Sequence, residues 1–439
     1  MKPVKIGIAG LGTVGCGTVN VLERNGDEIS RRAGRAIRVT RALVRDPRAA
    51  RDCRLDGVQI TTDPQELIDD PEIQVIVELV GGTDGIAHEI VMASIDKGKH
   101  VVTANKALIA VHGNTIFERA QARGVMVAFE AAVAGGICII KVIREGLSGN
   151  RVNRLAGIIN GTGNYILSEM RSGARTFEDV LAEAQRLGYA ESDPTFDVEG
   201  VDAAHKLTIL ASIAFGIPLQ FSRVYTEGIS RIRQEDVENA AELGYRIKHL
   251  GIASRVDNGF ELRVHPCMIP EQRLLANVEG VMNAILVEGD AVGPTLHYGA
   301  GAGADPTASA VVADLVDVVR ALTTDPNNRV PHLAFQPGSL SDLPVLHINQ
   351  IESAYYLHLK AVNRPGVLAD ITRILGDLSI SIQAIQQKGN GESESIMPIV
   401  IVTHRTREEF MDQALARLSS LGTVTGEITR IRLEPLEWD

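Results

Sequence analysis

The sequence has little of what several common kinds of site require. It contains only four cysteines in 439 residues, with no C-x-x-C spacing, so we expect neither a disulfide framework nor a zinc site. Its formal net charge is -11 and no run of lysines and arginines forms a tract, which argues against a nucleic-acid partner. No stretch approaches the roughly 20 apolar residues that span a bilayer. The first residues, MKPVKIGIAG, run into a glycine loop and do not resemble a signal peptide. We therefore expect a cytoplasmic protein without a membrane partner.

The first ~130 residues alternate short β-branched runs with amphipathic helical stretches, which predicts an α/β fold with a parallel sheet wrapped by helices. Expected helices include 14–24, 86–97 and 114–123, and 125–133 reads as a strand. Beyond residue 137 the pattern changes to an α+β one that begins with a helix at 137–147. A glycine loop, YGAGAG, then leads into a helix for which Asp305 fits the N-cap and Pro306 the first helical position.

A stretch rich in proline divides off the C-terminal part, which follows a compact βαββαβ order typical of ferredoxin-like domains. We therefore expect three domains and a linker. They are a Rossmann domain at 1–136 and 305–322, an α+β domain at 137–304, a linker at 323–350 and a small ferredoxin-like domain at 351–434.

The motif GLGTVG places Gly10, Gly12 and Gly15 in G-x-G-x-x-G spacing between a strand and a helix. The first glycine permits a tight turn, the second lets the backbone approach a pyrophosphate, and the third lets helix and strand pack closely. The helix N-terminus supplies N–H donors for the anion. At the start of a βαβ unit this pattern predicts a dinucleotide site, although a merely tight turn is the alternative.

The choice between NAD and NADP depends on the end of the second strand, where an acid usually binds the ribose 2′-OH of NAD. Here Arg45 comes before Asp46. A guanidinium at this place could pair with a 2′-phosphate, which favours NADP. The alternative is that Arg45 is solvated and pairs with Asp46, so NAD also stays open.

Five acids precede a single lysine in GYAESDPTFDVEGVDAAHKL, residues 188–207. Asp202 and Lys206 lie four apart on an expected helix, so they share a face, and a simple surface ion pair is one reading. The other reading is chemical. A positioned ammonium can protonate the oxygen of an aldehyde as hydride arrives at its carbon, and carboxylates such as Glu191 and Asp197 could hold a substrate ammonium. Asp193 and Glu199 read better as a cap and a turn.

Together these motifs resemble homoserine dehydrogenases of the single-function kind that end in an ACT domain. The resemblance covers nearly the whole chain and includes TANKAL, FEAAVAGGI, GIINGTGNYIL and YGAGAG besides the two motifs above. It implies reversible, NAD(P)H-dependent reduction of L-aspartate 4-semialdehyde to L-homoserine, on the route to threonine, methionine and isoleucine.

The resemblance also assigns catalysis, substrate binding and dimerisation to the domain at 137–304, regulation to the ACT domain at 351–434, and roles to single residues. Lys206 matches the proton donor, Asp202 its support, Lys106 a second lysine near the nicotinamide, and Glu191 and Asp197 substrate-binding acids. Further positions match contacts to the cofactor: Leu11, Thr13, Val14, Thr103, Lys106, Gly188 and Gly303.

Two accessory sites follow from the resemblance. The family carries a monovalent cation, usually sodium, whose ligands match Glu130, Val133, Gly135 and Ile137; one carboxylate and backbone carbonyls suit a hard cation. A strand cap and a Gly-Gly turn are the plainer reading. In the motif NRPGVL, Asn363 and Gly366 match an effector site that typically takes threonine. ACT domains generally pair, which implies a homodimer or homotetramer, and a purely structural role is the alternative.

Two rival functions remain at this point. A different NAD(P)-dependent dehydrogenase, acting on an amino acid or a hydroxy acid, would not need the acid-rich run. A non-catalytic amino-acid sensor would keep the ACT module but would not need Lys106, Glu191, Asp202 and Lys206 together.

Overall fold

The computed structural model describes residues 2–173, 175–388 and 395–436. Its contacts divide the chain into two compact units: unit 1 comprises 1–155, 204–224 and 282–343, and unit 2 comprises 156–203, 225–281 and 344–439. The elements β7 (Val152–Ile158) and α10 (Val201–Phe215) run from one unit into the other. The three-domain boundaries expected from the sequence stay a prediction. Within the described ranges, no helix has the length and apolar character to cross a membrane.

Unit 1 contains a six-stranded parallel sheet in the order β3-β2-β1-β4-β5-β6. This is the doubly wound order of dinucleotide-binding domains, in which ligands bind at the carboxyl ends of the strands. The strands are β1 (Val4–Ala9), β2 (Ile37–Leu43), β3 (Gln59–Thr61), β4 (Ile73–Glu78), β5 (His100–Thr103) and β6 (Val127–Ala128). The α/β class predicted from the alternation of strands and helices is confirmed.

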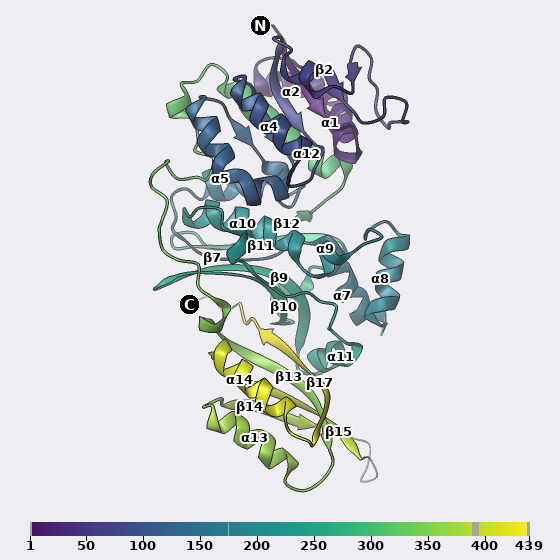
Figure 1. The fold of residues 1–439 in the computed structure, drawn as a ribbon, viewed down its shortest axis with the longest axis vertical. Helices are drawn as coiled ribbons and strands as arrows, with labels where there is room; N and C mark the ends of the chain where they lie inside the picture. Colours follow the sequence, from purple (N-terminus) through teal and green to yellow (C-terminus); the bar gives the residue numbers. More distant parts are fainter. Residues whose placement is uncertain (1, 174, 389–394, 437–439) are drawn as a thin grey trace. The chain divides into compact units, whose positions relative to one another are not determined.

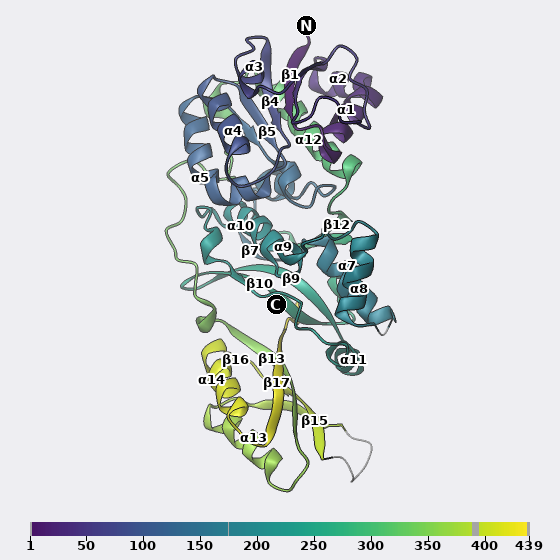
Figure 2. The same cartoon turned by 45° about the vertical axis from the view of Figure 1, so that its right-hand side comes forward.

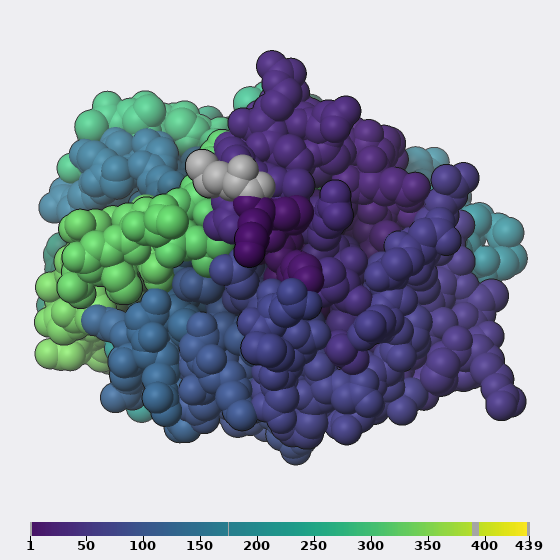
Figure 3. Space-filling model, turned by 90° about the horizontal axis from the view of Figure 1, so that it is seen from above, coloured from purple at the N-terminus to yellow at the C-terminus, as the bar shows by residue number. Residues whose placement is uncertain are grey.

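Helices cover both faces of this sheet because its strands are apolar on both sides (Figures 1 and 2). One core joins β1, β2 and β4 to α1, α2 and α12, and the other joins the opposite face to α3 and α4. In the space-filling view, green residues from the end of α12 onward lie beside the blue and purple N-terminal surface (Figure 3). The helices are α1 (Thr13–Arg24), α2 (Gly26–Ala33), α3 (Pro64–Ile68), α4 (Ile86–Asp96), α5 (Lys106–Ala122) and α12 (Ala304–Ala321).

Three local predictions for unit 1 were right only in part, because two helices have other bounds or geometry and one strand is much shorter. Helix α5 begins at Lys106, not at 114, because Gly113 continues the helix: a side chain at this position would overlap Leu219. The segment 125–133 holds only the short strand β6 and a 3₁₀ turn at Glu130–Ala132. The segment 137–147 forms one short helix, α6 (Ile139–Lys141), followed by a π-helical turn at Val142–Gly146.

The start of α12 also differs from the prediction. The helix begins at Ala304 and Gly303 is its N-cap, with a φ of 124° that favours glycine. Asp305 and Pro306 therefore lie in the first turn, and the Asp305 carboxylate pairs with Arg24 at 3.1 Å. The YGAGAG motif completes a hairpin made by β11 (Met282–Gly289) and β12 (Gly293–Ala300).

Unit 2 contains a sheet with the strand order β9-β10-β17-β13-β15-β14. Its last four strands belong to the βαββαβ segment and lie in the ferredoxin-like order 4-1-3-2, so that prediction is confirmed. The strands are β8 (Tyr225–Thr226), β9 (Tyr245–Val256), β10 (Gly259–Pro270), β13 (Glu352–Val362), β14 (Ile382–Gln387), β15 (Ile396–Thr403), β16 (Thr406–Arg407) and β17 (Val424–Leu433). The helices are α7 (Gly161–Gly173), α8 (Phe177–Arg186), α9 (Thr195–Val198), α11 (Gln234–Glu242), α13 (Val367–Asp377) and α14 (Glu408–Ser419).

Strand β13 is buried on both faces. Tyr355, Leu357 and Leu359 pack against α13 and α14, whereas Tyr356 packs in a second core with residues of α7 and α11. The Tyr356 hydroxyl donates to buried Asp236 and accepts from Asn239, both on α11. The βαββαβ segment is therefore packed into the rest of unit 2.

The strands β10 and β17 also join this segment to the preceding part of unit 2, and we call their junction the β10–β17 seam. It consists of a parallel pairing of Cys267 with Arg432 and of Met268 with Leu433. The fully buried Arg432 side chain donates to Glu408 on α14 and, at 2.8 Å, to Glu227 in the loop after β8. Burial alone would raise the pKa of the Glu408 carboxyl, but Arg432 holds that pKa below its ordinary value.

Candidate active site

The three glycines of GLGTVG face different surroundings. Gly10 has a φ of 97°, and an added Cβ would lie 2.6 Å from the Leu79 carbonyl oxygen. A Cβ on Gly15 would overlap the carbonyl oxygen of Gly10. Gly12 has an ordinary φ of -84°, is exposed, and no atom of the described chain lies within 4 Å of an added Cβ. The loop needs Gly10 and Gly15 for its own shape, whereas the open space at Gly12 is what a pyrophosphate requires.

The other predicted residues of this loop lead into α1. Leu11 is buried, Thr13 is exposed as the first residue of the helix, and Val14 is half-buried. The N-cap residue Gly12 has no side-chain hydrogen bond to the first turn. The N–H groups of the first helical turn have no partner within the helix and are thus left to donate to an anion at this N-terminus.

Two polar residues at this edge of the sheet were not predicted. Glu78, fully buried at the end of β4, accepts from the Thr103 hydroxyl at 2.6 Å and from the Val80 and Gly81 N–H groups. Asn105 caps α5 by accepting from Leu108 and donates to the Gly82 carbonyl. The acid at the end of a buried strand, in IQVIVELV, was the available signal. Glu78 thus holds two parts of the structure through hydrogen bonds. One is Thr103, which is a predicted cofactor contact, and the other is the loop after β4.

Lys106 and Arg45 lie beyond the same strand ends. Lys106 is the first residue of α5 and is half-buried. Arg45 follows β2 and is exposed, two positions after the strand ends at Leu43. The Asp46 carboxylate accepts from the backbone N–H of Arg48 at 2.8 Å, which forms a local turn.

Helix α10 carries Asp202 and Lys206 on one face, four residues apart. Asp202 is 4% exposed, and Lys206 is half-buried. Gly200 precedes the helix with a φ of 83°, and an added Cβ would lie 2.9 Å from the His249 ring. Only glycine can bring the acid-rich segment this close to its neighbours.

Asp197 on α9 and Asp202 on α10 are held by one side chain that the sequence analysis did not select. The amide nitrogen of Asn160 donates to Asp197 Oδ1 and to Asp202 Oδ2, each at 2.8 Å. The amide oxygen of Asn160 accepts from the Gly163 N–H at 2.8 Å, in the first turn of α7. Two of the predicted substrate acids are therefore brought together by a residue of the GIINGTGNYIL motif.

The remaining residues of the acid-rich segment lie at the surface. Gly188 is exposed with a φ of 77°, and Glu191 is exposed. Asp193 accepts from the Thr195 N–H at 3.1 Å, and Glu199 accepts from the Ser230 hydroxyl at 2.6 Å. The contacts of Asp193 and Glu199 agree with the structural roles expected for them.

The segment Phe129–Ile137 folds tightly against the YGAGAG motif. The Gly136 N–H donates to the Ala300 carbonyl at 2.9 Å, and a Cβ on Gly135 would lie 2.7 Å from Thr307 Oγ1. Ala134 has a φ of 50°, which is costly for a residue with a side chain. Val133 and Ile137 are buried. Because this backbone is irregular, not all of its carbonyl groups are used in helix or sheet hydrogen bonds. A cation site built on carbonyl oxygens needs such groups.

Glu130 lies beside a second buried acid, Asp314. Its carboxylate accepts from the Ile140 and Lys141 N–H groups at 2.9 Å, and its own N–H donates to Asp314. Burial and the neighbouring Asp314 raise the pKa of Glu130 to about 7, and burial raises the pKa of Asp314 to about 6. The Lys141 ammonium lies 3.9 Å from Asp314 and offsets part of this negative charge.

The residues predicted for an effector lie in the turn after β13. Asn363 and Gly366 are both exposed, and Gly366 caps α13 with a φ of 93°. The Asn363 N–H donates to the Ser395 carbonyl at 3.0 Å.

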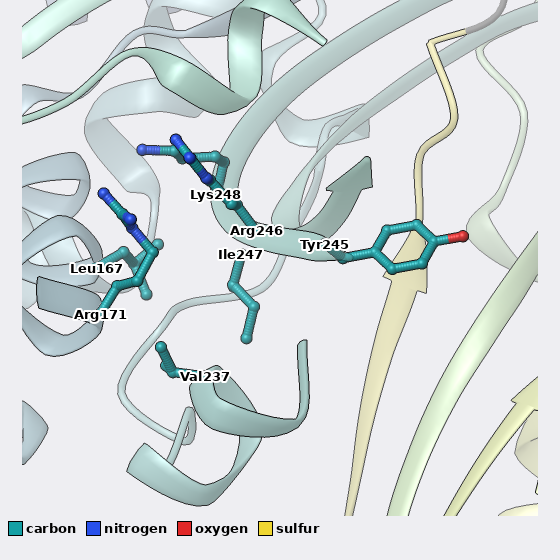
Figure 4. A pocket seen from close by; sticks show the side chains of 7 residues that line it. All are labelled: Leu167, Arg171, Val237, Tyr245, Arg246, Ile247 and Lys248. Carbon is teal, nitrogen blue, oxygen red and sulfur yellow. The ribbon is translucent and has the colours of Figure 1, made fainter. Parts of the chain in front are cut away.

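Away from these residues, unit 2 encloses a small cavity between α7, α11 and β9 (Figure 4). Its volume is about 10 Å³, which is room for about one water. Arg171, Arg246 and Lys248 surround it and share Glu279. Burial lowers the pKa of Lys248 to about 8. No predicted site residue lines this cavity, and Lys248 donates to Asn164 and Val278.

Comparison with known proteins agrees with this geometry. Residues 10–130 match the model of the homoserine dehydrogenase NAD-binding domain, residues 138–316 that of homoserine dehydrogenase, and residues 355–422 that of the ACT domain. The homoserine dehydrogenase of Pseudomonas aeruginosa is 64% identical over 99% of this chain and 100% of its own length. That of Neisseria gonorrhoeae is 53% identical over 99% of this chain and 100% of its own.

Solved structures give the same result. The crystal structure of a homoserine dehydrogenase from Thiobacillus denitrificans has a TM-score of 0.95 at 62% identity, with 100% of this chain and 99% of that chain covered. A homoserine dehydrogenase from S. aureus has a TM-score of 0.75 at 32% identity, with 99% of this chain and 100% of that chain covered. The rival readings, another dehydrogenase or an amino-acid sensor, find no support in these matches. The chain belongs to the homoserine dehydrogenase family, as an oxidoreductase with a nicotinamide cofactor and a C-terminal ACT domain.

Proposed function

We propose that Lys206 is the proton donor in the homoserine dehydrogenase reaction of this chain. The substrate, L-aspartate 4-semialdehyde, becomes L-homoserine when its aldehyde carbon gains a hydride and its oxygen gains a proton. A reduced nicotinamide cofactor supplies the hydride when it is bound. The observation that carries the proposal is the half-buried Lys206 on α10, one turn after the buried Asp202. An ammonium there stabilises the charge that develops on the oxygen and then protonates it.

The other polar residues divide into two roles. Asp202 supports Lys206 and, with Asp197 and Glu191, binds the ammonium of the substrate. Lys106 lies at the start of α5, directly after the strand end that carries Thr103, and assists near the nicotinamide. Gly188 and Gly303 let their loops approach the cofactor. These assignments rest on the motif matches and on the burial and contacts given above.

Lys206→Ala tests the central assignment. We expect kcat to fall about 10²- to 10⁴-fold, the range that a positioned general acid contributes, while the Kd of NADPH changes little. Lys206→Arg keeps the charge but not the acidity and should be almost as inactive. Near-normal turnover of Lys206→Ala would refute the assignment.

For the cofactor, we favour NADP over NAD because exposed Arg45 follows the second strand and Asp46 already caps a local turn. A hyperthermophilic archaeal homoserine dehydrogenase, 25% identical over 72% of this chain, has been solved in complex with NADPH. Arg45→Ala should raise the Kd of NADPH about tenfold and leave that of NADH unchanged, because only the former has a 2′-phosphate. Equal effects on both cofactors would contradict the preference.

A sodium ion at Glu130, with the carbonyls of Val133, Gly135 and Ile137, forms the second part of the proposal. No group of three His, Cys, Asp or Glu able to hold a metal occurs in the described parts of the chain, so such an ion depends on carbonyl oxygens. A cation beside Glu130 would lower the pKa that burial raises. Replacing Na⁺ by tetramethylammonium should lower the melting temperature of the parent but not that of Glu130→Gln.

The ACT domain is proposed to bind a small amino acid, typically threonine, at Asn363 and Gly366, and to take part in a homodimer or homotetramer. Calorimetric titration of the full chain with threonine tests the first point, because Asn363→Ala should lose the binding heat while turnover without threonine is kept. Sedimentation tests the second, since a monomer would exclude pairing. We further propose that the enzyme works in the cytoplasm, which fractionation of cells would test.

A further inference from the structure

Asn160 occupies an unusual position because its side chain satisfies three groups from three segments. Its amide nitrogen contacts carboxylates 37 and 42 residues further along the chain, each at 2.8 Å. Its amide oxygen accepts from the Gly163 N–H, which lies three residues ahead in α7. The Asn160 residue is 6% exposed; its contact with Asp202 is buried and its contact with Asp197 is partly buried.

The chemistry of an amide explains why asparagine occurs here. An NH₂ group offers two donor hydrogens, one for each carboxylate, and the oxygen remains available as an acceptor for the helix N-terminus. A carboxylate at position 160 would offer no donor, and a hydroxyl would offer only one. Hydrogen bonds to ionised acceptors are about twice as strong as neutral ones. Asn160 is thus matched to a pair of aspartates.

The bridge lowers the cost of bringing the two aspartates together. Both carboxylates lie within hydrogen-bonding distance of one nitrogen, and like charges this close repel each other strongly in a buried place. The Asn160 amide brings partial positive charge between them. It also anchors them to the rigid start of α7, because the amide oxygen is fixed by Gly163.

We propose that Asn160 is a positioning residue that joins Asp197 and Asp202 into a single two-carboxylate receptor for the substrate ammonium. This inference rests on the proposed function, which assigns both aspartates to the substrate. The receptor fixes where the ammonium binds, and thereby where the aldehyde lies relative to Lys206 on α10. The ammonium contact is made equally before and during hydride transfer, so Asn160 contributes to KM more than to kcat.

Asn160→Ser is the first test because serine can still cap α7 but provides only one donor. We expect KM for L-homoserine to rise about 10- to 100-fold, as expected for a lost hydrogen bond to a charged group, with kcat changed less than about threefold. Asn160→Asp keeps the cap and the size but loses both donors, and its KM should rise at least as much. The Kd of NADPH should be unchanged in both variants. A parental KM in Asn160→Ser or Asn160→Asp overturns the proposal.

Inhibition by 4-hydroxybutanoate distinguishes a specific effect on the ammonium receptor from a general disturbance of the substrate site. This molecule has the carboxylate and hydroxyl of homoserine but no amino group, so it makes no use of the receptor. Its inhibition constant should be the same in the parent, Asn160→Ser and Asn160→Asp. An inhibition constant that rises in step with KM overturns the proposal, because it shows that the variants disturb the site as a whole.

Asn164 provides a matched control. It is a buried asparagine of the same motif and helix, and its amide donates to the carbonyls of Val278 and Gly280. Asn164→Ala should lower the melting temperature and leave KM for homoserine unchanged; a KM increase equal to that of Asn160→Ser refutes the special role of Asn160. If Lys206→Ala and Asp202→Asn retain activity, the proposed function fails. If they lose it while Asn160→Ser has a parental KM, only the positioning role fails.

Discussion

The glycine loop of unit 1 and the aspartate pair of unit 2 are built in opposite ways. The loop at Gly10–Gly15 is formed by backbone, and it depends on the absence of side chains. Gly10 and Gly15 avoid overlap with neighbouring backbone atoms, and Gly12 leaves open space. The pair Asp197–Asp202 is formed by side chains, and its function depends on atoms that are present, above all the two donors of Asn160. The loop should therefore fail when atoms are added, and the pair should fail when polar atoms are removed or exchanged.

Gly15→Ala should have the largest effect. Its Cβ would overlap the Gly10 carbonyl oxygen, so the turn must open and the N–H donors of α1 move away from the pyrophosphate. We expect the Kd of NADPH, measured by fluorescence titration, to rise more than about 100-fold, with a melting temperature below that of the parent. Binding within a few fold of the parent would contradict the overlap.

Asp202→Asn tests the pair with the next largest effect. An amide at position 202 can place an N–H group against the Asn160 amide, and it removes the charge that we propose attracts the substrate ammonium and supports Lys206. We expect kcat/KM for homoserine to fall about 100-fold. The Kd of NADPH should stay at its parental value, because the cofactor loop contains no part of this pair. Weaker binding of NADPH would show that the glycine loop and the aspartate pair are not independent.

Gly12→Ala sharpens the contrast within the loop itself. The Gly12 φ of -84° suits alanine, and the described chain has no atom near the added methyl group. The melting temperature should therefore match that of the parent, while the Kd of NADPH rises about tenfold because the methyl occupies the space of the pyrophosphate. A parental Kd would mean that the cofactor does not approach the backbone here.

Glu78→Gln should have the smallest effect. Glutamine can keep its oxygen on the two backbone N–H groups, but its NH₂ then faces the Thr103 hydroxyl, which must accept instead of donate, and the negative charge of the acceptor is lost. We expect a loss of about 1–3 kcal/mol in the free energy of unfolding, read from denaturant titration, and only a few-fold increase in the Kd of NADPH. A stability equal to that of the parent would make Glu78 dispensable.

The two regions also differ in how far the sequence predicts them. The glycine loop lies within six consecutive residues between a strand and a helix, so its spacing and this local context together predict it. The same local reasoning placed Asp202 and Lys206 on one helix face, since four residues make about one turn. The start of α5 was missed because Gly113 suggests a break, although here it serves close packing against Leu219.

The role of Asn160 could not be predicted from spacing. Its partners lie 37 and 42 residues away, and no periodicity links an asparagine before α7 to acids on α9 and α10. The N-cap of α12 was assigned to Asp305 because aspartate is a common cap, but the positive φ at Gly303 determines where that helix begins. Long-range hydrogen bonds and backbone conformation were thus the parts that only the structure supplied.

The β10–β17 seam has a consequence for attempts to shorten this protein. Removing the ACT segment would take β17 away from Cys267 and Met268 of β10 and leave that part of the strand edge open, which invites association with other chains. It would also leave Glu227 without the guanidinium of Arg432, which donates to it at 2.8 Å. The C-terminal module should therefore not be treated as a detachable appendage. The proposed effector site is better tested by altering the exposed turn at Asn363 than by truncation.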